Sequence, residues 1–262
     1  MSTDIPKEST DWRMELVTHL AEAIPSAYPG GPSHEKGTLL YASFNIKTSD
    51  NQRISFAAPN AVAMLLNLAM TAANSASEMR QHLEFKNGFD PDGACKVVPL
   101  EGTQATFAMF EQSLAAITFS FLALEAYCNY IISRNWKQPV KVKRKKGKME
   151  ELSHTDAERF LSTEEKIKSV LPKIFDVPTP AGKAIWQRFL ELKKARDDSV
   201  HFKYADQYPV GKDIKTDGLF FQIWNTDPHE YPRTAKEVIE YFYQKTSQPD
   251  WLSRMPTLPK KK

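Results

Sequence analysis

Residues 104 to 134 read QATFAMFEQSLAAITFSFLALEAYCNYIISR, and this stretch decides the fold class. Its apolar residues recur at spacings of three and four, which is the period of one long α-helix. They are Phe107, Phe110, Leu114, Ile117, Phe121, Leu124, Cys128 and Ile131. Because the apolar face is very wide, the sequence predicts a core helix in a mainly α-helical protein.

The same helix raises the question of a membrane. Residues 114 to 132 are mostly apolar and about long enough to span a bilayer. Glu125 lies near the middle, with Asn129 one turn away, and a carboxylate there would cost roughly 2.5 to 3.5 kcal/mol on insertion. We therefore expect the core helix of a soluble protein that has no membrane partner.

The composition is that of an ordinary globular chain. The 262 residues include 35 basic and 32 acidic ones, so attraction for nucleic acid would have to come from local clusters. Cys95 and Cys128 are too few for a disulfide framework, and the first residues lack the apolar run of a secretory signal. These features predict a cytoplasmic protein.

Residues 1 to 100 are interpreted as an N-terminal extension of unknown role. The predicted elements are a helix from Trp12 to Ala23, a hairpin that contains Phe44, Ile46, Ile54 and Phe56, and a helix capped by Asn60 that runs to about Phe85. The glycines and proline between Lys86 and Gly93 predict a loop.

Residues 101 to 250 are predicted to form a helical bundle, and residues 251 to 262 a disordered basic tail. Within the bundle, Val140 to Lys148 is expected to be a solvated linker, and Ser162 with Glu165 matches a capping box. The later elements are a short helix limited by Pro172, a helix opened by Thr179 or Pro180, a strand from Gly218 to Trp224, and a helix from Thr234 to Tyr243.

The chemistry is concentrated in FLELKKARDDSVHFK, residues 189 to 203. Here an apolar helical stripe runs into Arg196, Asp197 and, four residues after Asp197, His201. This Arg-x4-His motif, in which a polar residue follows the arginine, resembles the active-site motif of the HEPN superfamily. Trp186 to Phe189 and the long helix around Phe121 to Tyr127 resemble the surrounding helices of bacterial HEPN proteins. The likeness covers roughly residues 104 to 205 and implies a HEPN-like, up-and-down helical bundle that follows a mixed N-terminal extension.

The resemblance implies a metal-independent endoribonuclease, as a toxin or antiphage effector, that needs no cofactor. His201 has a reference pKa of about 6.5 and would exchange protons, while Arg196 would hold a phosphate. Five helical residues turn the chain by about 140°, so these two side chains do not share a stripe in one protomer. Family nucleases generally dimerise with both motifs in one cleft, so the partners expected are RNA, a second copy, and an antitoxin or other protein.

Supporting roles are assigned to three more residues. Asp197 lies one turn before His201 and is expected to orient its ring. Glu125 and Asn129 form a polar stripe on an apolar helix, and Arg196 is the expected partner of the Glu125 carboxylate. A basic cluster is the candidate RNA contact, with a solvated loop as the alternative; it consists of Lys141, Lys143, Arg144, Lys145 and Lys146.

A second reading of the motif stays open. Arg196 and His201 could stabilise a helix C-terminus in a catalytically silent module that binds a nucleotide or a partner protein. An open polar cleft around both side chains would favour the enzyme, and burial of both against apolar side chains would favour the module. No metal site is predicted, since adjacent Asp197 and Asp198 point about 100° apart on a helix.

Overall fold

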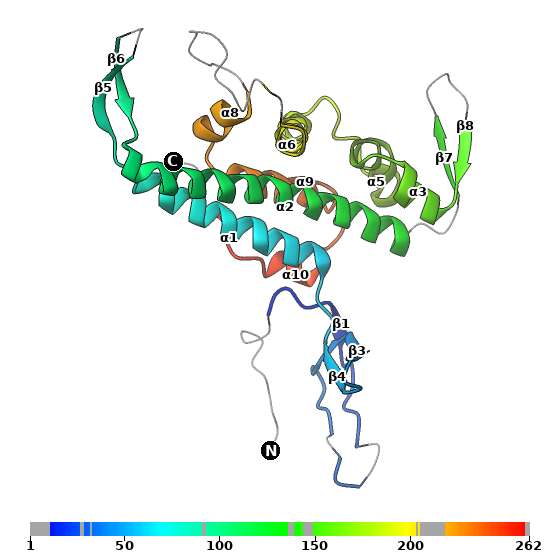
Figure 1. Ribbon diagram of the computed structural model, residues 1–262. Coiled ribbons are helices and arrows are strands. Elements are labelled where there is room, and N and C mark those ends of the chain that lie inside the picture. Colours follow the sequence, from blue (N-terminus) through cyan, green and yellow to red (C-terminus); the bar gives the residue numbers. More distant parts are fainter. Residues whose placement is uncertain are drawn as a thin grey trace. The chain divides into compact units, whose positions relative to one another are not determined.

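A computed structural model describes residues 11–26, 29–31, 33–90, 93–135, 139–143, 149–202, 204 and 218–259, with the backbone alone at positions 16, 17, 19, 39, 90 and 140–143. The described part is mainly α-helical, as predicted (Figure 1). It divides into a small unit, Met1–Met64 with Gln248–Thr257, and a large unit, Leu65–Ser247 with Leu258–Lys262.

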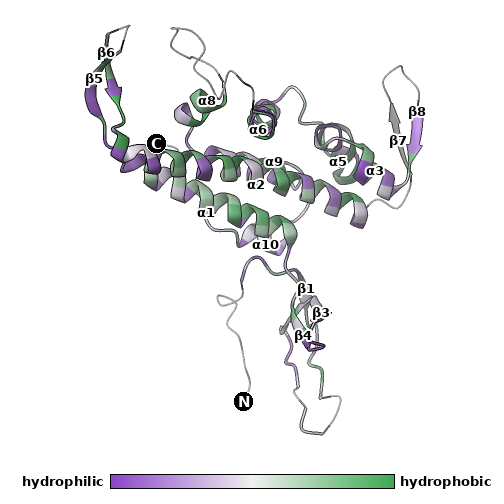
Figure 2. Cartoon of the chain, in the orientation of Figure 1, coloured by the Kyte–Doolittle hydropathy of each residue, from purple (hydrophilic) through white to green (hydrophobic). Residues whose placement is uncertain are grey.

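The centre of the large unit is the long helix α2, Thr103–Asn135, which confirms the predicted core helix. Figure 2 shows that α2 is largely hydrophobic, and Ile117, Phe121, Leu124 and Ile132 are almost fully buried. α2 contacts α9, Glu230–Tyr241, along with α6, Ala184–Val200, and these two helices also contact each other. Three helices thus enclose the main core.

Shorter elements line one side of α2 (Figure 1). They are α3, His154–Phe160; α4, Thr163–Glu165; the π-helical turn η3, Lys166–Val170; α5, Leu171–Phe175; and α8, Leu219–Asn225. The short 3₁₀ turn η2, Leu100–Gly102, precedes α2.

Local capping signals are confirmed where the sequence predicts them. The Ser162 hydroxyl accepts a hydrogen bond from the Glu165 backbone N–H, and the Glu165 carboxylate accepts one from the Ser162 N–H, which completes a capping box. The helical run then continues past Pro172, which stands in the first turn of α5, and ends where Asp176 adopts a left-handed conformation. The predicted limit at Pro172 is therefore wrong by one turn.

Two segments predicted as loops form hairpins. β5, Lys86–Asp90, pairs antiparallel with β6, Gly93–Val97, so the loop expected from Lys86 to Gly93 is the start of a hairpin. β7, Val140–Lys143, pairs with β8, Met149–Leu152, and Lys141 lies opposite Glu151. Residues 140 to 143 of the predicted solvated linker thus belong to a strand, whereas residues 144 to 148 lie outside the described residues.

The small unit contains the hairpin predicted around Phe44 and Ile54. β3, Ser43–Lys47, pairs with β4, Arg53–Ala57, so that Phe44 faces Phe56 and Ile46 faces Ile54. The helix predicted from Trp12 to Ala23 is wrong: β1, Leu16–His19, pairs with β2, Leu39–Tyr41.

The C-terminal segment also differs from the prediction. Trp251 and Leu252 are buried in the short helix α10, Asp250–Ser253, so residues 251 to 253 are not a disordered tail. Burial of a Trp and a Leu side chain offsets the cost of ordering so short a segment. The predicted division of the chain at residue 100 stays a prediction.

α1, Ala61–Gln81, is capped as predicted, because the Asn60 Oδ1 accepts a hydrogen bond of 2.9 Å from the Ala63 N–H.

Within the described residues, the segment Leu100–Asn135 is long and apolar enough to cross a bilayer by length and composition, a test that core helices of soluble proteins also pass. The interpretation as a core helix of a soluble protein stays a prediction.

Candidate functional site

The motif residues lie on the last two turns of α6. α6 is fixed against α2 and α9 by Phe189, Leu192 and Ala195, all of which are buried. Val200, one turn after Arg196, is 56% exposed. The helix ends at His201, whose backbone N–H donates to the Asp197 carbonyl over 3.0 Å. Buried contacts on the preceding turns therefore set the position of Arg196.

The Arg196 side chain has two contacts, one with an aromatic ring and one with a carboxylate. Its guanidinium lies over the Phe121 ring, with Cζ 4.0 Å from the centroid, and Nη1 lies 3.2 Å from Asp197 Oδ1. Its Nε is buried and has no hydrogen-bond partner among the described residues. The side chain as a whole remains 30% exposed.

His201 is exposed at the end of the helix. The His201 ring makes no hydrogen bond within the described part of the chain. The Asp197 carboxylate instead contacts Arg196 and, over 3.2 Å, Lys193 Nζ. The expected orienting role of Asp197 toward His201 is thus wrong in this chain, because neighbouring cations compete for the carboxylate. Asp197 positions Arg196 instead.

The predicted pair of Glu125 and Arg196 is also wrong. No hydrogen bond or ion pair joins these two described side chains. In the polar stripe of α2, Asn129 instead forms a hydrogen bond with Lys166. Lys166 is 1% exposed, and its Nζ donates to Asn129 Oδ1 and to the Glu158 carbonyl, each over 2.7 Å. Burial lowers the pKa of Lys166, a shift that the nearby Glu125 charge opposes.

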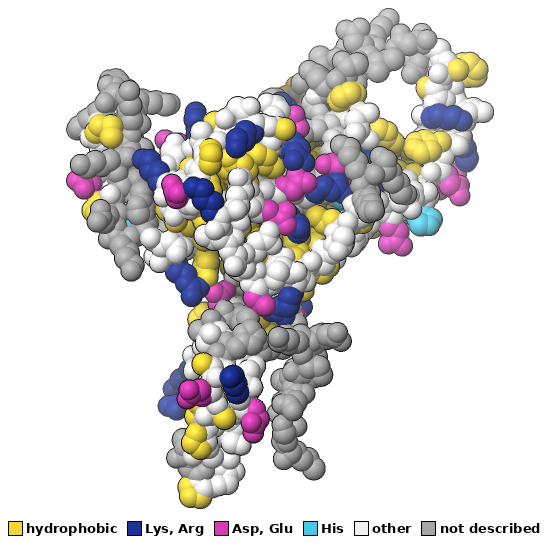
Figure 3. Space-filling view, turned by 180° about the vertical axis from the view of Figure 1, so that it is seen from behind, with side chains coloured by type: hydrophobic (Ala, Val, Ile, Leu, Met, Phe, Trp, Pro, Cys, Tyr) yellow, Lys and Arg dark blue, Asp and Glu magenta, His cyan; other side chains and the backbone are white. Residues whose placement is uncertain are grey.

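The basic cluster is described only in part. Lys141 and Lys143 belong to β7 by their backbone, whereas Arg144, Lys145 and Lys146 lie outside the described residues. On the face of the helical part seen in Figure 3, basic and acidic side chains are interspersed. No single-sign field covers this face, in agreement with the balanced composition.

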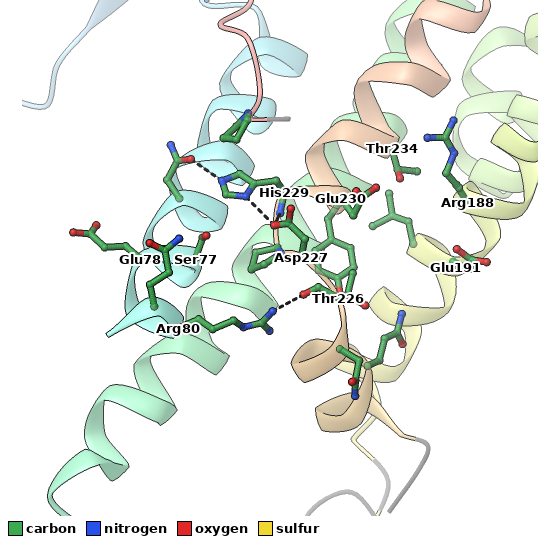
Figure 4. Close-up of a pocket in the computed structure, with 18 residues that line it drawn as sticks. Ser77, Glu78, Arg80, Arg188, Glu191, Thr226, Asp227, His229, Glu230 and Thr234 are labelled. Atoms are coloured by element: carbon green, nitrogen blue, oxygen red, sulfur yellow. Dashed lines mark hydrogen bonds and ion pairs between the residues drawn. The ribbon is translucent and has the colours of Figure 1, made fainter. Parts of the chain in front are cut away.

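A separate pocket of about 1110 Å³ opens in the large unit between α1, α6, α8 and the start of α9 (Figure 4). Several polar side chains line it, including Glu78, Arg80, Arg188, Glu191 and His229, but neither Arg196 nor His201 does. In the part of the chain that the structure describes, no group of three His, Cys, Asp or Glu side chains could hold a metal ion.

His229 links two walls of this pocket. Its Nδ1 lies 2.9 Å from Asp227 Oδ1 and its Nε2 lies 2.9 Å from Asn74 Oδ1 on α1 (Figure 4). Burial raises the pKa of Asp227, but hydrogen bonds from the His229 backbone and ring outweigh it and leave that pKa below its ordinary value. Both ring nitrogens are occupied, so His229 is a structural link rather than a free base.

Lys166 and His229 were not identified from the sequence as residues with buried partners. Lys166 follows a correctly predicted capping box, and the unexplained polar stripe of Glu125 and Asn129 was the signal that a buried partner existed. His229 gave no such signal, because Asn74 is 155 residues away. No family model, curated protein or solved structure matches this chain.

Proposed function

We propose that this protein is a metal-independent endoribonuclease of HEPN type, with Arg196 and His201 as its catalytic residues. The observation that carries the proposal is the arrangement at the end of α6, where an exposed histidine follows an arginine that is held by two contacts and is 30% exposed. The reaction is inferred from the resemblance to HEPN proteins, because this chain has the Arg-x4-His spacing of their active-site motif.

The chemistry follows from these two groups. The 2′-oxygen of the RNA attacks the adjacent phosphorus while His201 takes its proton. The bond from phosphorus to the 5′-oxygen breaks, the imidazolium returns a proton to that oxygen, and a 2′,3′-cyclic phosphate remains. Arg196 stabilises the charge that develops on the phosphorane oxygens. Asp197 and Phe121 restrict the guanidinium, which reduces the cost of ordering it on the phosphate.

A second copy of the chain is part of the proposal. Arg196 turns inward to the Phe121 ring of α2, whereas His201 is exposed after the last turn of α6. The two side chains therefore point in different directions in one protomer, so a site composed of two motifs would be completed across a dimer.

The test is an RNA cleavage assay in EDTA. The parent should produce 2′,3′-cyclic ends from mixed RNA, and His201→Ala should lower the rate by about 10² to 10⁴-fold. Its melting temperature should stay unchanged, because the His201 ring makes no hydrogen bond to the described residues. His34→Ala removes another exposed histidine as a matched control. Undiminished cleavage by His201→Ala, or its unfolding, would refute the assignment.

The rival is a catalytically silent helical module that binds a nucleotide or a partner protein. The pocket beside His229 favours it, because a cavity of about 1110 Å³ is large enough for a nucleotide and is separate from the motif. No cleavage by the parent, combined with a thermal shift upon addition of nucleotides, would favour this rival.

A further inference from the structure

A row of aromatic rings begins directly after His201. Phe202 contacts Phe220 with ring centroids 6.1 Å apart, and Phe220 contacts Phe110 at 4.9 Å. Phe110 contacts Trp224 at 6.0 Å, and Trp224 contacts Phe85 at 6.2 Å. The rings come from the end of α6, from α8, from α2 and from the segment after α1. We call these residues the aromatic row.

Much of the aromatic row is open to solvent. Phe202 is 38% exposed, Trp224 37% and Phe85 43%. Phe110 and Phe220 are half-buried and connect the exposed rings. Single exposed apolar residues are common, but a contiguous set of large exposed aromatic side chains is typical of a binding surface.

The row is rigid at its centre. α8 is anchored by Leu219 and Ile223, which are buried on its inner face. Arg80 of α1 donates hydrogen bonds to the carbonyls of Ile223 and Thr226, the latter over 2.9 Å. These hydrogen bonds fix the end of α8 and hold Trp224 against Phe110. A surface ordered in advance loses little entropy upon binding.

We propose that the aromatic row is a stacking surface for single-stranded RNA and presents the strand to His201. This inference rests on the proposed ribonuclease function. Aromatic rings stack on the faces of all bases, so such a surface binds a single strand without sequence preference. Continuity favours RNA over a protein partner, because a strand stacked along the row continues to the residue that would take its 2′ proton.

The charge of the chain agrees with this mode of binding. A net charge of only +3 leaves little long-range attraction for phosphates over the surface as a whole. Stacking would then supply a large share of the affinity. Removal of a ring should weaken binding without a change in its salt dependence, because the same number of phosphates stays neutralised.

The experiment measures binding of a fluorescent oligouridylate of about ten nucleotides to the full chain carrying His201→Ala, which prevents cleavage. Phe202→Ala and Trp224→Ala should each weaken binding by roughly 5- to 150-fold with an unchanged slope against log salt. Trp224→Phe keeps a ring and should restore most of the affinity. Phe44→Ala, which removes a 52% exposed ring from the small unit, should bind as the parent does.

Three results would overturn the proposal. One is equal affinity of Phe202→Ala and the parent, another is equal weakening in Phe44→Ala, and the last is absence of RNA binding while the row mediates binding of a protein. If Trp224→Ala unfolds, Phe202→Ala and Trp224→Phe still decide. Cleavage assays of proteins that retain His201 separate the two proposals. RNA binding that depends on the aromatic row, without any cleavage, would refute only the ribonuclease function. Cleavage at an unchanged rate in Phe202→Ala would refute only the role of the aromatic row.

Discussion

The guanidinium of Arg196 lies over the ring of Phe121, with Cζ 4.0 Å from the ring centroid. Phe121 in turn stacks on Phe189, two turns before Arg196 on α6, with centroids 6.4 Å apart and ring planes inclined by 19°. A cation over an aromatic ring contributes about 0.5 to 2 kcal/mol, with the larger values in desolvated sites. The motif is thereby joined to the central helix of the bundle.

A double-mutant cycle of Phe121→Leu and Arg196→Met should give a coupling energy of about 0.5 to 2 kcal/mol, because the two side chains are in direct contact. Urea denaturation of the four proteins measures it. Phe175→Leu is the control, since Phe175 contacts Phe242 and Tyr243 instead and should not couple to Arg196. A coupling energy of zero for Phe121 would refute the contact.

Elements with a local cause could be predicted from the sequence. The long apolar period predicts α2 almost to its ends, and short-range caps predict the helices that begin after Asn60 and Ser162. In each case the residues that stabilise the element lie within it or within one turn of it. Local information was enough there.

Elements with a distant cause could not be predicted. Gly218 to Trp224 is rich in aromatic residues that favour strands, yet Arg80 binds the carbonyls of Ile223 and Thr226 at the end of a helix. A cation at those carbonyls stabilises the helix C-terminus. Likewise, residues 16 to 19 pair with residues 39 to 41, and this pairing overrides the helical period of the segment.

The candidate site was predicted only in its chemistry. The types and spacing of Arg196 and His201 are visible in the sequence, but the partners of Arg196 depend on the packing of α6 against α2. Sequence reasoning paired Glu125 with Arg196 and did not identify Lys166, which donates a hydrogen bond to Asn129 on the same polar stripe. Burial, which decides between them, is a property of the fold.

Lys166→Met tests the buried lysine. Burial lowers the pKa of Lys166 in the folded state below its ordinary value of 10.5, so between these two pKa values the unfolded chain binds more protons. The free energy of unfolding should therefore rise with pH through this window, and the rise should be absent in Lys166→Met. Other groups titrate in both proteins, so the difference isolates Lys166.

Lys168→Met is the matched control for this experiment, because Lys168 is exposed two residues later. Chemical denaturation at a series of alkaline pH values gives the comparison. A stability difference between the parent and Lys166→Met that stays flat, or that falls as pH rises, would contradict the lowered pKa.

Asp227→Asn tests the link between α1 and α9. The pKa of Asp227 lies below its ordinary value of 3.8, so its contribution is present above 3.8 and is lost as pH falls through the folded pKa. At pH 7 the variant should lose about 1 kcal/mol, because neutral hydrogen bonds replace charge-assisted ones to His229. This difference should shrink in acid. Asp176→Asn removes a carboxylate that is 94% exposed and should cost less; equal destabilisation by the two variants would argue against the link.

Replacement of the basic cluster tests electrostatic binding of RNA. The cluster, Lys141, Lys143, Arg144, Lys145 and Lys146, should release counterions if it binds phosphates. Its exchange for serine should weaken RNA binding and reduce the slope against log salt by about 0.7 for each phosphate that is no longer neutralised. Variants of the aromatic row should leave that slope unchanged, so electrostatic binding and stacking are distinguishable. Lys168→Ser with Lys173→Ser removes exposed lysines elsewhere as a control. If the slope of affinity against log salt equals that of the parent, the cluster does not bind phosphates and is a solvated loop.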